Sequence, residues 1–474
     1  MAKPIFAAVF TALVSASALG VACSASSDRA GRDAPGGGAS SGGNVGTGAT
    51  GGGVSIDVDS GAGGGGSGCP TTVSGTVYDP AGTLPLYNVV VYVPSEPVEP
   101  IVSGAACETC DGNFSGRPIA AAVSDVAGKF TMDIANVPAR TEIPLVVQAG
   151  KWRRQVTIPA ATDCADTPLD GELTRLPRSK QEGNLPKIAV MRGGSDALEC
   201  IFTKIGVDLA EFSSDAGEGS IHLYYSNLVN ATAETGQMSA ASGAVPLTPA
   251  ETLFGDLTKM KTYDMILLNC EGGDDRYNPP NLTHRENVHR YFNEGGRLFG
   301  GHYHNGIIDN RELPDGYPPF PSVVQFSPGR SDITPKLFTA TVNTGFEKGR
   351  ALADWLFNVG ASPMAGSIAI NDSERTVIDT LDPTAVSWIN TTFSGQNAAL
   401  YYGFPTPVGG AACGRAVFTD VHLASGSGDS GKAVFPSCAT ELSPQQKALA
   451  FLIFDLANCV TTTETEPPPP PVVY

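Results

Sequence analysis

The sequence predicts a multidomain protein in which a small all-β sandwich precedes an α/β domain with a doubly wound sheet. Two observations predict this order. Residues 69–176 contain short runs of alternating apolar and polar residues, rich in β-branched and aromatic side chains and separated by turn residues. In residues 187–460, short apolar runs instead alternate with segments of helical periodicity, as expected when helices cover both faces of a mostly parallel sheet.

Composition excludes several classes of protein. The chain has 474 residues, with 30 Lys and Arg against 48 Asp and Glu, and a formal net charge of −18. So few basic residues argue against a nucleic-acid partner, because contacts to phosphates depend on Lys and Arg. A hydrophobic content of 41% is too high for a wholly disordered chain. We therefore expect an acidic, folded protein that binds no nucleic acid.

The N-terminus is predicted to be a lipoprotein signal peptide, residues 1–22. Lys3 precedes an apolar run from Ile5 to Leu19 that is shorter than the about 20 residues of a membrane span. The end of this run resembles a bacterial lipobox: Ala18-Leu19-Gly20-Val21-Ala22-Cys23. The resemblance implies cleavage before Cys23 and lipid attachment to its sulfur, although Gly20 stands where Leu is usual. The alternative is a plain signal peptide followed by an unrelated cysteine.

The segments between and after the predicted domains are expected to lack regular structure. Residues 23–68 hold the lipidated Cys and a Gly/Ser-rich disordered tether, because 17 of the 38 positions from 31 to 68 are glycine. Such a coil spans roughly 35–40 Å. Residues 177–186 are expected to be a polar linker, and residues 461–474 a Pro-rich disordered tail.

In the first domain, residues 69–176, five strands are expected, near 73–78, 89–93, 129–134, 145–148 and 152–158. Three motifs in this region, Ser74–Gly82, Leu86–Tyr92 and Asp125–Thr131, resemble the carboxypeptidase regulatory-like domain, a transthyretin-like β-sandwich. The resemblance implies a non-catalytic accessory module.

In the second domain, residues 187–460, the predicted elements alternate. Strands are expected near 187–191, 263–270, 297–301, 398–402 and 415–420. Helices are expected near 195–205, 253–260, 285–293 and 347–359. A last helix begins at a capping box, Ser443 with Gln446, and has Pro444 in its first turn.

Three blocks of this domain, 263–269, 286–302 and 414–422, resemble the class I glutamine amidotransferase-like superfamily and, within it, the ThuA-like group. The resemblance implies a flavodoxin-like doubly wound sheet. The chemistry of a glutaminase is not expected, because the turn after the strand at 297–301 carries His302 where the nucleophilic Cys would stand. Ala424 likewise replaces the carboxylate expected two residues after His422.

A candidate site lies at the carboxyl ends of the predicted strands, where ligands bind in this class of sheet. His302, His304 and His422 follow strands, and Asp420 and Glu271 lie at comparable strand ends. Imidazoles and carboxylates could bind a divalent metal such as zinc, for which His302, His304, His422 and Glu271 are the candidates. His302, His422 and Asp420 could instead act as acid and base on a sugar.

The alternative to such a site is that these polar residues merely cap strand ends and bind nothing, and no other cofactor is expected. The remaining histidines of this region, His284 and His289, are expected on the surface of a helix.

The cysteines indicate export to an oxidising compartment. Cys69 and Cys164 bracket the first domain and could join its ends. Cys107 and Cys110 could be a redox pair, half a zinc site or a small-loop disulfide, and the flanking glycines favour the disulfide. A further disulfide between Cys200 and Cys270 is expected. Among the others, Cys413, Cys438 and Cys459, one more bridge is expected, which leaves one thiol over.

Two functions remain in competition. The first is a membrane-anchored exported lipoprotein with a binding or structural role at the bacterial cell envelope, most readily at the outer membrane, with a carbohydrate or an envelope protein as partner. The second is an extracellular ThuA-like enzyme that acts on a carbohydrate or cell-envelope substrate with the help of a metal. The missing nucleophile favours the first.

Overall fold

The computed structural model describes residues 69–112, 114–226, 235–270, 281–301, 304–308, 323–332, 336–393, 396–423 and 427–474. Residues Asp59–Tyr474 belong to one compact unit. The expected signal peptide, Cys23 and the tether up to residue 68 lie outside the described residues. No helix in the described part of the chain is long and apolar enough to cross a membrane.

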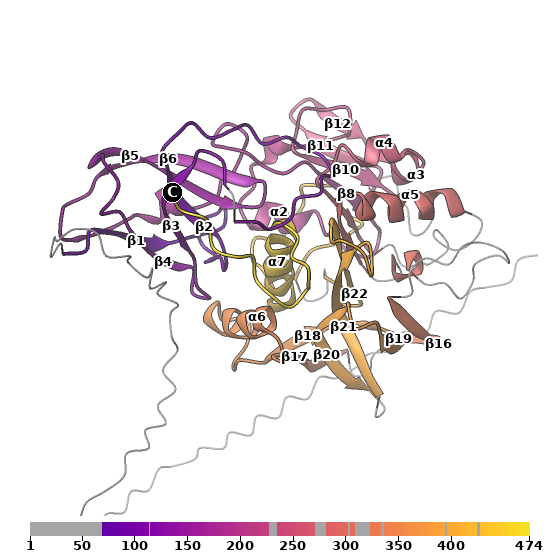
Figure 1. Cartoon of the computed structure of the whole chain (residues 1–474). Coiled ribbons are helices and arrows are strands. Elements are labelled where there is room, and N and C mark those ends of the chain that lie inside the picture. The colour runs from indigo at the N-terminus through magenta and orange to yellow at the C-terminus, as the bar shows by residue number, and fades with distance from the viewer. Residues whose placement is uncertain are drawn as a thin grey trace, which may run out of the picture. The chain divides into compact units, whose positions relative to one another are not determined.

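Two sheets form the N-terminal part of this unit (Figure 1). The three-stranded sheet has the order β4-β1-β7, with β1 at Thr72–Thr76, β4 at Lys129–Asp133 and β7 at Asp166–Pro168. The four-stranded sheet has the order β3-β2-β5-β6, with β2 at Val90–Pro94, β3 at Pro118–Val123, β5 at Thr141–Ala149 and β6 at Trp152–Ala160. Both sheets contribute buried side chains to one core, among them Val73, Phe130, Val91 and Val147.

The second part is built on an 11-stranded sheet whose main path is β13-β10-β8-β14-β15-β22-β21-β20-β17-β18, with β9 paired to β10. Its first strands are parallel to one another: β13 (Thr248–Pro249), β10 (Ile221–Tyr225), β9 (Phe212–Ser213), β8 (Ile188–Arg192), β14 (Met265–Leu268), β15 (Arg297–Gly300) and β22 (Gly414–Thr419). Antiparallel strands then extend the sheet: β21 (Gln396–Thr406), β20 (Val386–Phe393), β17 (Leu337–Val342) and β18 (Ser367–Asn371).

Smaller elements complete the described chain. Two antiparallel strand pairs are separate from the large sheet: β11 (Gln237–Ala240) with β12 (Gly243–Pro246), and β16 (Val324–Asp332) with β19 (Glu374–Leu381). The helices are α1 (Gly171–Thr174), α2 (Cys200–Lys204), η1 (Leu209–Glu211), α3 (Ala250–Phe254), α4 (Leu257–Met260), α5 (Leu282–Asn293), η2 (His304–Ile307), α6 (Glu347–Asn358) and α7 (Pro444–Ala457).

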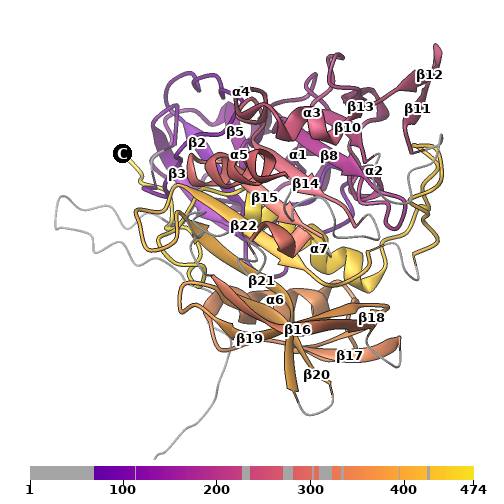
Figure 2. The same ribbon diagram turned by 90° about the vertical axis from the view of Figure 1, so that its right-hand side faces the viewer.

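Helices lie on both faces of the parallel strands (Figure 2). In β14, Ile266 and Leu268 pack into one cluster with α3 and α5, whereas Leu267 packs into another with α7. This alternation follows from the strand itself, because successive side chains point to opposite faces. It also explains why the strand is apolar at every position, as a strand covered on both faces must be.

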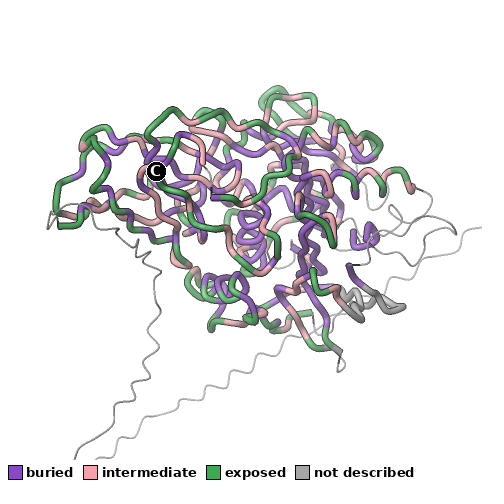
Figure 3. The backbone as a smooth tube through the Cα atoms, in the orientation of Figure 1, coloured by how far each residue is buried: buried purple, intermediate pink, exposed green. Residues whose placement is uncertain are grey.

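Helix α7 is buried all round because it lies between the large sheet and the N-terminal sheets (Figures 1 and 3). It begins as expected, with Ser443 and Gln446 forming a capping box. Its Phe451 ring stacks on Tyr87 at a centroid distance of 5.8 Å, and Phe454 contacts Trp152 at 5.8 Å. The two predicted domains therefore share one continuous hydrophobic core.

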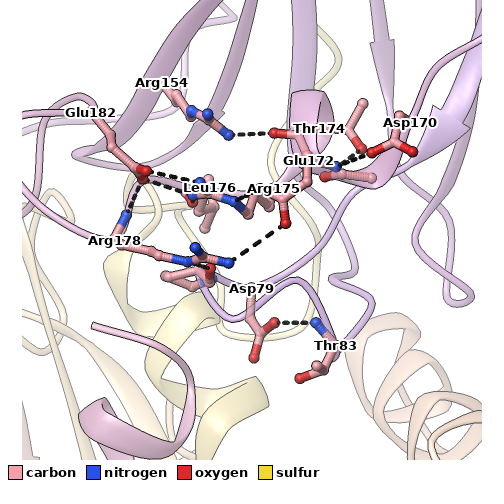
Figure 4. Close-up of polar contacts among 12 residues, drawn as sticks. Asp79, Thr83, Arg154, Asp170, Glu172, Thr174, Arg175, Leu176, Arg178 and Glu182 are labelled. Carbon is pink, nitrogen blue, oxygen red and sulfur yellow. Dashed lines mark hydrogen bonds and ion pairs between the residues drawn. The ribbon is translucent and has the colours of Figure 1, made fainter. Parts of the chain in front are cut away.

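The expected linker at 177–186 is an ion-paired joint (Figure 4). Arg175, buried at the end of α1, donates two hydrogen bonds to the Glu182 carboxylate, at 2.7 and 2.8 Å, and one to Glu172 at 2.8 Å. The Arg175 hydrogen bonds lower the pKa of Glu182 to about 2. Arg178 continues the joint by donating to the Pro80 carbonyl at 2.9 Å. Within this segment, Glu182 and Arg178 are paired with Arg175 and Glu172, which lie just before it.

The C-terminal segment 461–474, expected to be disordered, lies along the folded unit. The Glu464 carboxylate is buried and accepts hydrogen bonds from Arg415 and from the Trp388 indole at 3.1 Å. Further on, the Val472 amide donates to the Gly112 carbonyl at 2.8 Å. The polar and proline-rich composition predicted disorder. The segment is nevertheless ordered, because a single buried carboxylate with a cationic partner anchors it.

Four disulfides connect segments that are far apart in sequence. Cys69 is bonded to Cys164, the pair that the sequence suggested. Cys107 and Cys110 are not bonded to each other: they bind Cys413 and Cys459, respectively, because residues 107–110 lie against the start of β22 and the end of α7.

The expected pair Cys200–Cys270 is also wrong. Cys200 is bonded to Cys438, and Cys270 is the cysteine outside a disulfide in the described chain, a buried thiol. Helix α2 presents Cys200 to the loop that precedes α7, whereas Cys270 follows β14.

Removal of the buried Glu464 carboxylate should destabilise the whole unit. In Glu464→Ala, Arg415 loses one of its two buried counter-ions, and breaking a buried ion pair in this way costs about 3–5 kcal/mol. Urea unfolding followed by circular dichroism measures the loss. Glu466→Ala, an exposed carboxylate two residues further on, is the matched control and should change the unfolding free energy by less than about 0.5 kcal/mol.

Asp79 should make stability depend on pH in an unusual direction. Its carboxylate accepts hydrogen bonds from the Thr83 and Leu84 amides at 2.9 and 3.0 Å, and burial raises its pKa from 3.8 to about 6. The folded state therefore binds this proton more tightly than the unfolded state, so stability falls as the pH rises from about 4 to 6. Asp79→Asn should remove a fall of up to about 3 kcal/mol. Urea midpoints measured between pH 4 and 7 that decline equally in both proteins would contradict this.

Candidate functional site

The parallel strands β8, β14, β15 and β22 are neighbours in the large sheet (Figure 2). A buried polar residue follows the carboxyl end of each of them. These ends lie at one edge of the sheet, which is where open α/β sheets bind ligands. Asp196 follows β8, Asn269 follows β14, His304 follows β15 and Asp420 follows β22. Each of the four residues is no more than 2% exposed.

A hydrogen bond connects the chain segments that follow β8 and β14. The Asn269 side-chain amide donates to the Asp196 carbonyl at 2.6 Å, while the Asn269 side-chain oxygen is buried and accepts no hydrogen bond from the described residues. Arg192 at the end of β8 pairs with Glu199 at 2.7 Å and also donates to the Thr235 carbonyl at 3.1 Å. Arg192 therefore fixes the loop that carries Asp196, and its charge is balanced within the protein.

Asp196 also approaches the other side of the edge. Burial raises the pKa of Tyr401 on β21, and the negative charge of Asp196 adds to this rise, so the carboxylate lies within electrostatic range of this hydroxyl. The backbone of Asp420 is fixed by two hydrogen bonds: its amide donates to the Leu400 carbonyl and its carbonyl accepts from the Ser373 hydroxyl, both at 2.9 Å. Two buried carboxylates, a phenol and an amide oxygen thus lie along this edge of the sheet.

His304 lies in the short helix η2, and His289 positions that helix. The His289 ring on α5 is buried, and burial lowers its pKa to about 3, so the ring is neutral near pH 7. Its Nε2 donates to the Ile307 carbonyl at 2.7 Å, at the end of η2. The expectation that His289 lies on the surface is therefore wrong, because α5 turns this face toward η2. His284 is half-buried on the same helix.

His422 lies just beyond β22 and is held through its backbone. Its amide donates to the Asp372 carbonyl at 3.2 Å, and its carbonyl accepts from the Gln445 side chain in the first turn of α7. It therefore follows the same strand as Asp420 but lies at the side of the edge next to β18 and α7.

Two candidates of the sequence analysis, His302 and Glu271, lie outside the described residues. Within the described ranges, no three His, Cys, Asp or Glu side chains are grouped so that they could hold a metal ion. The zinc site, two of whose four proposed ligands are not described, stays a prediction. Cys270 follows β14, whereas a glutaminase of the resembled superfamily would carry its thiol in the turn after the next strand, β15.

Sequence reasoning missed Asp196, Asn269 and Tyr401. Asn269 carried a usable signal, since it is the first polar residue after the apolar run that ends at Leu268. Asp196 had been placed inside a helix from 195 to 205, but α2 begins only at Cys200 and leaves Asp196 in the loop at the strand end. Tyr401 lies in the strand expected near 398–402, but the antiparallel pairing that places it opposite Thr419 of β22 has no local signal.

Comparisons with known proteins leave the family open. No protein-family model matches the sequence, and no curated protein matches it. Among solved structures, a protein of Bacteroides uniformis described as ThuA-like matches with 10% identity and a TM-score of 0.31, covering 60% of this chain and 95% of that one. A TM-score this low supports no conclusion about shared fold or activity.

Proposed function

We propose that this protein is an exported, lipid-tethered binding protein of the bacterial cell envelope that holds a polar ligand, with carbohydrate as the favoured class, at the carboxyl edge of its parallel strands. The observation that carries the proposal is the placement of buried Asp196, Asn269, Tyr401 and Asp420 along that edge. Carboxylates, an amide and a phenol are the groups that sugar hydroxyls require as hydrogen-bond partners.

Export is supported by the four disulfides, because such bonds persist in oxidising compartments. The lipobox-like sequence before Cys23 and the glycine-rich residues after it supply the tether. The acidic, basic-poor composition suits an exported surface that binds no nucleic acid.

We also propose the fold assignment on which this reading rests. The first part is a carboxypeptidase regulatory-like, transthyretin-like sandwich, supported by two sheets that share one core. The second is a doubly wound, flavodoxin-like domain of the class I glutamine amidotransferase-like type, supported by parallel strands with helices on both faces. His302 in place of the nucleophilic Cys argues against amidotransferase activity.

A second candidate is an extracellular ThuA-like enzyme that acts on a carbohydrate or cell-envelope substrate with a divalent metal. The observation that favours it is the placement of His304 and Asp420 after adjacent parallel strands, β15 and β22. In that case His302, His304, His422 and Glu271 would be the metal ligands.

Lipid attachment should depend on Cys23 alone. In a bacterial host fed radiolabelled palmitate, the full chain should carry the label and fractionate with membranes, whereas Cys23→Ser should lose the label and become soluble. Ser24→Ala is the matched control and should behave as the unaltered chain does. A Cys23→Ser protein that still carries the lipid would refute the proposed anchor.

An array of immobilised bacterial envelope glycans, probed with the full chain in zinc and in EDTA, separates the two functions. If the protein is a binding protein, the glycans should retain it in both conditions. The amount of protein retained should fall at least tenfold in Asp420→Asn and stay unchanged in Glu96→Gln, a variant in the N-terminal part. Zinc-dependent glycan cleavage that is lost in His422→Ala would favour the enzyme. An array with neither retention nor cleavage would reject carbohydrate as the ligand class.

A further inference from the structure

The C-terminal segment crosses from the large sheet to the N-terminal sheets and ends against the latter (Figure 1, yellow). After α7, the Val460 amide donates to the Glu108 carbonyl at 2.9 Å. The segment then passes Glu464 and a run of five prolines, Pro467–Pro471. At its end, the amides of Val472 and Tyr474 donate to the carbonyls of Gly112 and Pro118 at 2.8 and 2.9 Å.

The segment is held very differently on the two sides of residue 466. Glu464 is 2% exposed and is fixed by the charge of Arg415. The prolines cannot donate backbone hydrogen bonds. Beyond them, the exposed fractions of Val472, Val473 and Tyr474 are 41%, 51% and 58%. Residues 467–474 are therefore held much more weakly than the anchor at Glu464, and such segments open locally at small cost.

The surface under this segment has three features that would suit any extended chain. The carbonyls of Gly112 and Pro118 accept main-chain hydrogen bonds, which are independent of side-chain identity. The Arg117 guanidinium lies over the Tyr474 ring, 5.5 Å from its centroid, and offers a cation–π contact to an aromatic residue. Gly112 also lets the chain come close, since a Cβ atom there would lie 2.9 Å from the Pro470 carbonyl oxygen.

We propose that Gly112, Arg117 and Pro118 form a peptide-docking edge for an extended, proline-rich chain of a partner protein, and that residues 467–474 are its resident and displaceable occupant. Proline-rich chains are preformed in the extended polyproline conformation, so they lose little entropy on binding. Because Glu464 holds the resident segment nearby, its effective concentration is in the millimolar range, and it competes with any chain that binds from outside. This surface is separate from the strand-end site.

The test is the binding of a labelled peptide, Pro-Pro-Pro-Pro-Pro-Val-Val-Tyr, measured by fluorescence anisotropy. A chain that lacks residues 467–474 but keeps Glu464 should bind the peptide, and the full chain should bind it at least tenfold more weakly. Full-length Val472→Pro lacks the amide donated to Gly112, so it should release the edge without any deletion and bind the peptide more tightly than the unaltered chain.

Two further variants test the individual contacts. A peptide N-methylated at its first valine should bind the truncated chain about fivefold more weakly, because it lacks the donor to Gly112. Arg117→Ala in the truncated chain should weaken binding about two- to fivefold.

Thermal melting should first show that the truncated and Val472→Pro chains are folded like the unaltered chain. The proposal is overturned if these folded proteins do not bind the peptide. It is equally overturned if the full and truncated chains bind it alike, because the peptide would then occupy some other surface.

Discussion

The neutralisation of Arg415 is the constraint on which the arrangement of the described unit depends. This guanidinium lies in β22, in the middle of the large sheet, and is 4% exposed. Its charge is balanced by Asp455 on α7 and by Glu464, while Lys348 on α6 donates to Asp455 at 3.0 Å. A buried charge without partners would be costly, so these four groups fix α6, α7 and the C-terminal segment against the sheet together.

Because α7 is fixed in this way, it buries apolar side chains on both sides. One side covers the parallel strands, and the other receives Tyr87 and Trp152 from the N-terminal sheets. The disulfides of Cys107 and Cys110 and the buried ion pair between Lys151 and Asp264, 2.6 Å apart, close the same interface. The N-terminal sheets are therefore an integral part of the scaffold that positions the strand-end site.

Much of the second domain was predictable because its strands and helices carry strong local signals. The run Met265–Leu268 is apolar at every position, which indicates burial on both faces, and the capping box at Ser443 located the start of α7 correctly. The strand-end location of the candidate site followed from the same signals. In the antiparallel extension, β21 matches the strand expected near 398–402, but β20, β17 and β18 were not expected, because their places are set by pairing across the sheet.

By itself, the sequence determined the acidic character of the chain, its glycine-rich stretch at 31–68, many of the elements at 187–460 and some of the polar groups at the strand ends. Local composition and periodicity carry this information. Only the tertiary structure decided which cysteines pair, that Glu464 is buried, that residues 177–186 are a joint, and that Asp196 meets Asn269. Apart from the Arg175–Glu182 pair within the joint, these features depend on contacts between residues distant in sequence. Neither the charge of one residue nor its neighbours specifies such a partner.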